Sequence, residues 1–226
     1  MSDNIKKQEE RNAIVRKKML DLHDVKVVAM PSDSPWLRPV RLTFTQDGKK
    51  KNWDVARIHD SVAIIVFNKS RKTLVFVRQF RPAVYNAMLP EKYQNVDTNI
   101  YRPENGLSVE LCAGIVDKDL PIIEIARDEL KEECGYEAPA ESFEKVITYR
   151  SIAATCGRHT MYYVEVTDDM KIHPGGGDES EGELIEVVEM TIPEAKAYIS
   201  SEEVLSPPAF LYGVTWFLAN KINSYS

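Results

Sequence analysis

Three glutamates lie close together in the segment ELKEECGY, namely Glu129, Glu132 and Glu133. The segment reads as a helix, and at about 100° per residue Glu129 lies beside both of the others on one face. Repulsion at this spacing destabilises an isolated helix by roughly 0.2–0.5 kcal/mol per pair. The cluster is therefore either a solvated acidic face or an oxygen-rich site for a hard cation such as Mg²⁺.

The helix that carries these glutamates is predicted over residues 120–134. Its apolar residues recur with helical periodicity and form the expected buried stripe, at Ile122, Ile125, Ala126, Leu130 and Cys134. This stripe turns the glutamates outward. Gly135 follows where glycine commonly ends a helix, and Gly114 ends the strand-like segment LSVELCAGIV before it.

Strands are predicted through most of the chain. Residues 38–46 and 52–58 alternate around the turn signal DGKK and predict an antiparallel hairpin. Further strands are expected at 61–68, 73–80, 143–151, 159–167 and 184–190. The pattern predicts one mixed α/β (α+β) domain with many strands and few helices.

The remaining segments predict helices and one loop. Residues 191–200 and 206–223 read as helices, the first capped by Thr191. The polar segment 86–106 reads as a long loop, which in a compact domain is usually functional or disordered. Residues 5–22 could form a charged helix that packs on a partner subunit or frays.

The composition limits the possible functions. The chain has 226 residues and a net charge of −6, which argues against nucleic acid as a partner. An anionic substrate would thus need local arginines or a metal. Three widely spaced cysteines favour reduced thiols. No apolar run could span a membrane and no signal peptide is evident, so the cytoplasm is expected.

The spacing of these residues resembles the Nudix box, G-x5-E-x7-R-E-U-x-E-E-x-G-U, in which U is an aliphatic residue. The residues in register are Gly114, Glu129, Leu130, Glu132, Glu133 and Gly135. Two positions depart from the box, because Leu120 replaces its first glutamate and Asp128 replaces its arginine. Arg127 is rotated by about 100° from that position and is no simple substitute.

The resemblance extends over roughly residues 35–222, through HDSV…FVRQFRPAVY, ELCAG, EECGY and GELIEVVEM. These segments look like the UDP-sugar pyrophosphatase branch of the Nudix family, close to the ADP-ribose pyrophosphatases. The resemblance implies mixed β-sheets between helices with an N-terminal antiparallel β extension. It divides the chain into an extension for dimerisation and substrate binding (1–58) and a Nudix hydrolase domain (59–226).

The same resemblance assigns the metal and catalytic residues. Glu129 and Glu133 are expected to bind Mg²⁺, or Mn²⁺, directly, with Glu132 beside them and the Ala113 carbonyl as a backbone ligand. Glu183 would bind metal or act as the general base, and Glu181 is the alternative base. An acidic loop without function is the other interpretation. The glycines of PGGG (174–177) would give this loop the flexibility to close.

Three residues are candidates for substrate binding. Arg81 suits a diphosphate, unless it forms a structural ion pair. Trp53 could stack on uracil, although an indole near a strand end is more often in the core. Arg158 could reach a phosphate or a ribose.

The resemblance implies a Mg²⁺-dependent homodimer that splits UDP-glucose into UMP and glucose 1-phosphate. The segment YRSIAA (149–154) lacks the prolines typical of the ADP-ribose enzymes and thus favours a UDP-sugar. The alternatives are an ADP-ribose or broad nucleotide-sugar pyrophosphatase, and a binding protein with little catalytic activity.

Overall fold

The computed structural model describes residues 3–34, 37–90, 95–178, 180 and 182–224. Its helices are α1 (Asp3–Met19), α2 (Pro82–Ala87), α3 (Ile122–Cys134), α4 (Ile192–Ile199) and α5 (Pro208–Asn220). Its strands are β1 (Arg38–Gln46), β2 (Lys49–Arg57), β3 (Ser61–Asn68), β4 (Thr73–Phe80), β5 (Leu107–Glu110), β6 (Cys112–Ile115), β7 (Glu144–Arg150), β8 (Arg158–Val166) and β9 (Ile185–Thr191). Within the described residues, no helix is long and apolar enough to cross a membrane.

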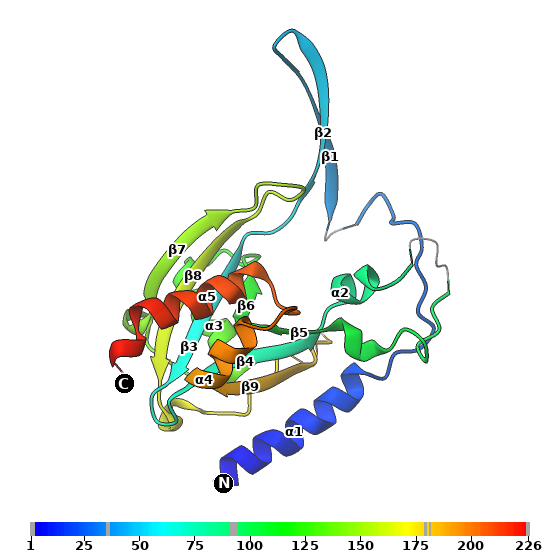
Figure 1. Cartoon of the computed structure of the whole chain (residues 1–226). Coiled ribbons are helices and arrows are strands. Elements are labelled where there is room, and N and C mark those ends of the chain that lie inside the picture. The colour runs from blue at the N-terminus through cyan, green and yellow to red at the C-terminus, as the bar shows by residue number, and fades with distance from the viewer. Residues whose placement is uncertain (1–2, 35–36, 91–94, 179, 181, 225–226) are drawn as a thin grey trace.

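The main sheet has seven strands and is centred on β3 (Figure 1). β3 pairs with β8 in parallel along its length and pairs with β6 and β4 in antiparallel fashion, at its beginning and its end respectively. β4 also pairs with β5 and with β9, in both cases in antiparallel fashion. The predicted strand LSVELCAGIV is thus divided at Leu111, because its first half pairs with β4 and its second half with β3.

Helices cover both faces of this sheet, as the predicted fold class requires. The side chains of β3 alternate between two cores: Val62, Ile64 and Val66 pack towards α3, and Ile65 and Phe67 towards α4 and α5. Burial on both faces explains why β3 is a continuous apolar run. The mixed α+β architecture is confirmed, whereas α2 had no sequence signal that we recognised and extends into the predicted loop at residues 86 and 87.

Helix α3 begins after Pro121 and ends at Gly135, whose φ of 79° is in the left-handed region. The prediction that all three glutamates face outward is wrong for Glu133, which is only 3% exposed. Glu133 follows Ala126 by about two helical turns, so it lies on the same buried face. The buried face of α3 therefore includes a carboxylate.

The glycine-rich loop after β8 packs against the C-terminal end of α3. The amide of Gly176 donates to the Glu133 carbonyl (2.7 Å), and the amide of Gly177 donates to the Glu132 carbonyl (3.2 Å). Both glycines have positive φ, and a side chain at Gly176 would overlap Arg11. This loop satisfies helix carbonyls that would otherwise lack a partner, and it fixes the position of the residues that follow.

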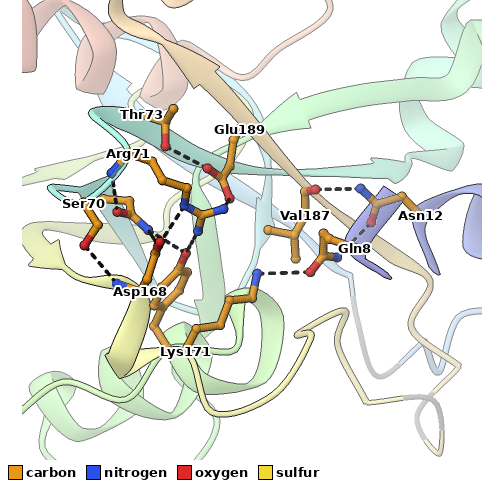
Figure 2. A network of polar contacts seen from close by, with 11 residues as sticks. Gln8, Asn12, Ser70, Arg71, Thr73, Asp168, Lys171, Val187 and Glu189 are labelled. Atoms are coloured by element: carbon orange, nitrogen blue, oxygen red, sulfur yellow. Dashed lines mark hydrogen bonds and ion pairs between the residues drawn. The ribbon is translucent and has the colours of Figure 1, made fainter. Parts of the chain in front are cut away.

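Helix α1 lies along the edge strand β9 rather than fraying (Figures 1 and 2). Asn12 donates to the Val187 carbonyl (2.7 Å), and Lys171 donates to Gln8 (3.0 Å). Val15 and Met19 of α1 are buried. These contacts cover the outer edge of β9, which is otherwise unpaired on that side.

The hairpin of β1 and β2 stands away from the sandwich (Figure 1). Asp47 and Gly48, both with positive φ, form its turn. Leu42 pairs with Trp53, and these two residues are 50% and 59% exposed. The hairpin thus presents an apolar face that the described residues leave about half exposed.

Candidate active site

Glu133 is the most enclosed of the helix carboxylates. It accepts a hydrogen bond from the backbone amide of Ala113 (2.8 Å), which belongs to β6. Burial raises the pKa of Glu133 well above its usual range. The bond joins α3 to the strand that precedes it and brings the predicted backbone ligand, Ala113, beside a predicted carboxylate ligand.

Glu129 lies one turn earlier on α3 and packs directly on Gly114. A Cβ at Gly114 would overlap the Glu129 side chain, which explains the glycine at this position. Burial, together with the charges of Glu132 and Glu183, raises the pKa of Glu129 to about 7. Three of the predicted site residues, Ala113, Glu129 and Glu133, are thus brought together at β6.

Glu183 reaches this group from the loop before β9. Its carboxylate accepts a hydrogen bond from the amide of Asp178 (3.0 Å) and packs on Gly177. Its charge contributes to the raised pKa of Glu129. The alternative base, Glu181, lies outside the described residues.

Arg81 lies just after β4 and binds Glu110 through two hydrogen bonds, of 2.8 and 2.7 Å. The Glu110 hydrogen bonds raise the pKa of Arg81, with smaller contributions from Glu133 and Glu183. Arg81 thus forms the ion pair that was the alternative interpretation of its role, and Glu110 fixes the orientation of its guanidinium. Glu110 was missed from the sequence, although an acidic residue within the apolar strand LSVELCAG was a usable signal.

The other two substrate candidates lie outside this group. Arg158 binds Asp60 through its backbone amide (2.8 Å) and its Nε (3.1 Å). Trp53 lies on the projecting hairpin and is exposed, so it is not a core residue. The single chain brings neither residue into contact with Glu129 or Glu133.

Leu120 and Asp128, the two residues that depart from the Nudix box, are both exposed, whereas Arg127, next to Asp128, has structural partners. Arg127 binds Glu124 (2.6 Å) and the Ala138 carbonyl (3.1 Å), so it is engaged along α3. Leu120 is 45% exposed in the loop before α3. Neither side chain takes the place of the residue that the box has there.

The carboxylates fit a hard divalent cation. Among the described residues, no three histidine, cysteine or carboxylate side chains form a ready-made metal cluster. Mg²⁺ usually keeps several waters and takes only one or two protein carboxylates, which Glu129 and Glu133 can supply. Burial first, and then the charges of Glu132 and Glu183, raise the pKa of Glu129, and a bound cation would offset these effects.

Two neighbouring cavities adjoin Ala113 and Arg81. One, of about 340 Å³, is lined by Ala113, Glu110 and the beginnings of β3 and β8. The other, of about 450 Å³, is lined by Arg81, Glu110 and residues 204–207. They share Glu110 and Pro207, so together they can accept an elongated ligand that reaches from Ala113 to Arg81.

This fold, with acidic residues on a helix beside a cavity and an arginine, is typical of a hydrolase that acts on a diphosphate. No model of a protein family matches the chain. The chain is 40% identical to a mouse protein named uridine diphosphate glucose pyrophosphatase NUDT14, over 86% of this chain and 94% of that protein. The bovine protein of the same name is 38% identical, over 82% and 90%.

A bacterial relative has a different named substrate. The GDP-mannose pyrophosphatase of Citrobacter koseri is 32% identical, over 81% of this chain and 87% of that protein. The chain therefore belongs to the Nudix family of nucleotide-sugar pyrophosphatases.

The raised pKa of Glu129 predicts a pH-dependent effect of Mg²⁺ on stability. In the unfolded chain the pKa of a glutamate is about 4.3. In the folded chain the pKa of Glu129 is raised to about 7. The folded state thus binds more protons between these values, and metal-free stability falls as the pH rises through them. Mg²⁺ binds the deprotonated form, so it should raise the melting temperature more at pH 8 than at pH 5.5.

Differential scanning fluorimetry with and without Mg²⁺ measures this effect. Glu129→Gln should reduce the difference between the two pH values and should raise the metal-free melting temperature at pH 8. Equal Mg²⁺ effects at both pH values in the wild-type protein would contradict the assignment of Glu129 as a ligand.

Proposed function

We propose that this chain hydrolyses the diphosphate of UDP-glucose and releases UMP and glucose 1-phosphate, with Mg²⁺ as cofactor. The observation that carries this proposal is the placement of Glu129 and Glu133 beside β6, where Glu133 accepts a hydrogen bond from the Ala113 amide and Glu129 packs on Gly114. The 40% identity with a uridine diphosphate glucose pyrophosphatase supports the substrate.

Glu129, Glu133 and the Ala113 carbonyl would hold the metal, with Glu132 beside them. Mn²⁺ accepts the same oxygen ligands. A metal ion held there would neutralise charge on the diphosphate and would lower the pKa of a water molecule.

The residues of the chain have separate tasks around the diphosphate. Arg81 binds its oxygens through a planar guanidinium that Glu110 already orients, so little side-chain entropy is lost on binding. Glu183 accepts the proton of the attacking water, in a loop held by α3 carbonyls. Arg158, oriented by Asp60, binds a ribose or phosphate oxygen at the edge of the site.

A GDP-sugar is the second candidate substrate, because a relative with 32% identity is a GDP-mannose pyrophosphatase. ADP-ribose is the third. Hydrolysis of UDP-glucose, GDP-mannose and ADP-ribose, measured side by side with Mg²⁺, tests these alternatives. The highest kcat/KM is expected for UDP-glucose; turnover of none of the three would favour a binding protein.

We also propose that the protein is a cytoplasmic homodimer without affinity for nucleic acid. Residues 1–58 form the extension in which the hairpin packs on the partner subunit. Its exposed apolar face supports this role, since exposed apolar patches commonly mark interfaces. Trp53, on that face, would complete the partner's site by stacking on uracil, while residues 59–226 form the hydrolase domain.

Leu42→Asp should convert the dimer to a monomer, because a charge would be buried in the interface. Thr43→Asp is the matched control, since adjacent residues of a strand point to opposite faces. Light scattering coupled to gel filtration measures the mass of each variant. A wild-type mass of one chain, or equal effects of both substitutions, would contradict this interface.

A further inference from the structure

The 340 Å³ cavity beside Ala113 has the composition of a small-molecule site. Its wall is mostly apolar and includes Ala63, Leu111, Pro207 and Phe210. Its size falls within the range of about 300–1,000 Å³ that is usual for ligand pockets. Such pockets carry a few fixed polar groups that orient the ligand.

The fixed polar group of this cavity is a histidine held between two serines. Ser61 Oγ lies 2.7 Å from His159 Nδ1, and Ser151 Oγ lies 2.9 Å from His159 Nε2. The ring of Tyr149 packs on the imidazole, with centroids 5.2 Å apart. The three polar residues come from β3, β8 and the segment after β7, so the strand pairing fixes their relative positions.

The hydrogen-bonding capacity of this trio is only partly used. In either neutral tautomer, one ring nitrogen accepts from a serine and the other donates to a serine. The serine that accepts keeps its own hydroxyl hydrogen for a ligand, and both serines keep free lone pairs. The trio thus offers both donors and acceptors, which suits the hydroxyl groups of a sugar.

The cavity also adjoins the reacting centre. Ala113 lines it and donates its amide to Glu133, whereas Glu110 lines it and holds Arg81. In a nucleoside diphosphate sugar the hexose is joined to its phosphate through a single oxygen. The uracil base is separated from the other phosphate by the whole ribose. A cavity in contact with the diphosphate site therefore fits the hexose better than the base.

We propose that this cavity binds the glucosyl group, with Ser61, His159 and Ser151 as the residues that position it; this rests on the proposed function. The glucosyl hydroxyls exchange hydrogen bonds with the two serines. The carbon–hydrogen face of the ring packs on Pro207 and Pro208. The cavity of Arg81 receives the diphosphate and the nucleoside beyond it.

Inhibition by each of the two products, glucose 1-phosphate and UMP, tests the binding of one half of the substrate. Ser61→Ala and Ser151→Ala should each weaken inhibition by glucose 1-phosphate by roughly three- to tenfold, the effect of one neutral hydrogen bond. Inhibition by UMP should be unchanged. KM for UDP-glucose should rise by the same factor, with kcat nearly constant.

Ser142→Ala is the control, because its hydroxyl bonds only the nearby Pro139 carbonyl at an exposed site. Weaker inhibition by UMP instead of glucose 1-phosphate would overturn the proposal, since the cavity would then hold the uridine half. Unchanged inhibition by both products would also overturn it and leave the trio a structural role. If the wild-type protein does not hydrolyse UDP-glucose, the proposed function fails and the cavity assignment fails with it; the other two outcomes reject the cavity assignment alone.

Discussion

Glu133→Gln is expected to lower kcat for UDP-glucose about a thousandfold at saturating Mg²⁺. The amide removes a negative charge from the proposed metal site, and a catalytic metal contributes several kcal/mol, at about 1.4 kcal/mol per tenfold in rate. The glutamine oxygen can still accept the hydrogen bond of the Ala113 amide. Since burial raises the pKa of Glu133, loss of the charge should not lower the melting temperature.

Steady-state kinetics and thermal unfolding of the same preparation test both statements. Glu137→Gln is the matched control: Glu137 is exposed just beyond the same helix and pairs with Lys131. Its kcat should equal that of the wild type. The metal site would need another carboxylate if Glu133→Gln kept more than about a tenth of the wild-type kcat, a loss of only 1.4 kcal/mol.

The elements of the hydrolase fold were predictable because their local signals agree with their tertiary environment. The strand that became β3 is apolar throughout and is buried on both faces. Helix α3 ends at Gly135, as its left-handed φ requires. The box glutamates were also recognisable, because a fixed spacing on a helix is a local property.

The details that were missed depend on contacts between distant segments. Glu133 reads as a surface residue, yet the Ala113 amide, 20 positions away, satisfies it inside the protein. Glu110 can be recognised as the partner of Arg81 only once the pairing of β4 with β5 is known. The position of α1 was left open because a charged helix shows no partner in its own sequence.

Glu186→Ala is expected to lower the free energy of unfolding by about 3 kcal/mol, the cost of breaking a buried ion pair. Glu186 lies on β9 and its side chain is fully buried. It binds Arg16 of α1 at 2.7 Å, and Arg78 of β4 binds its other oxygen. Removal of this carboxylate leaves two guanidinium groups without their shared counter-charge and leaves a cavity beneath α1.

The two arginines are less costly to lose, because they are partly exposed. Arg16→Met should thus lower the free energy of unfolding by only about 1 kcal/mol. Lys17→Met, on the exposed face of α1, should lower it by less than about 0.5 kcal/mol. Urea denaturation measures the free energy of unfolding of all three variants.

Glu186 stands three residues after Glu183, and Arg11 of α1 contacts both Gly176 and the Ile185 carbonyl. A loose α1 should therefore free both ends of the loop that carries Glu183, and Arg16→Met should lower kcat more than Lys17→Met does. Equal stability and equal kcat in these two variants would mean that α1 does not hold β9 in solution.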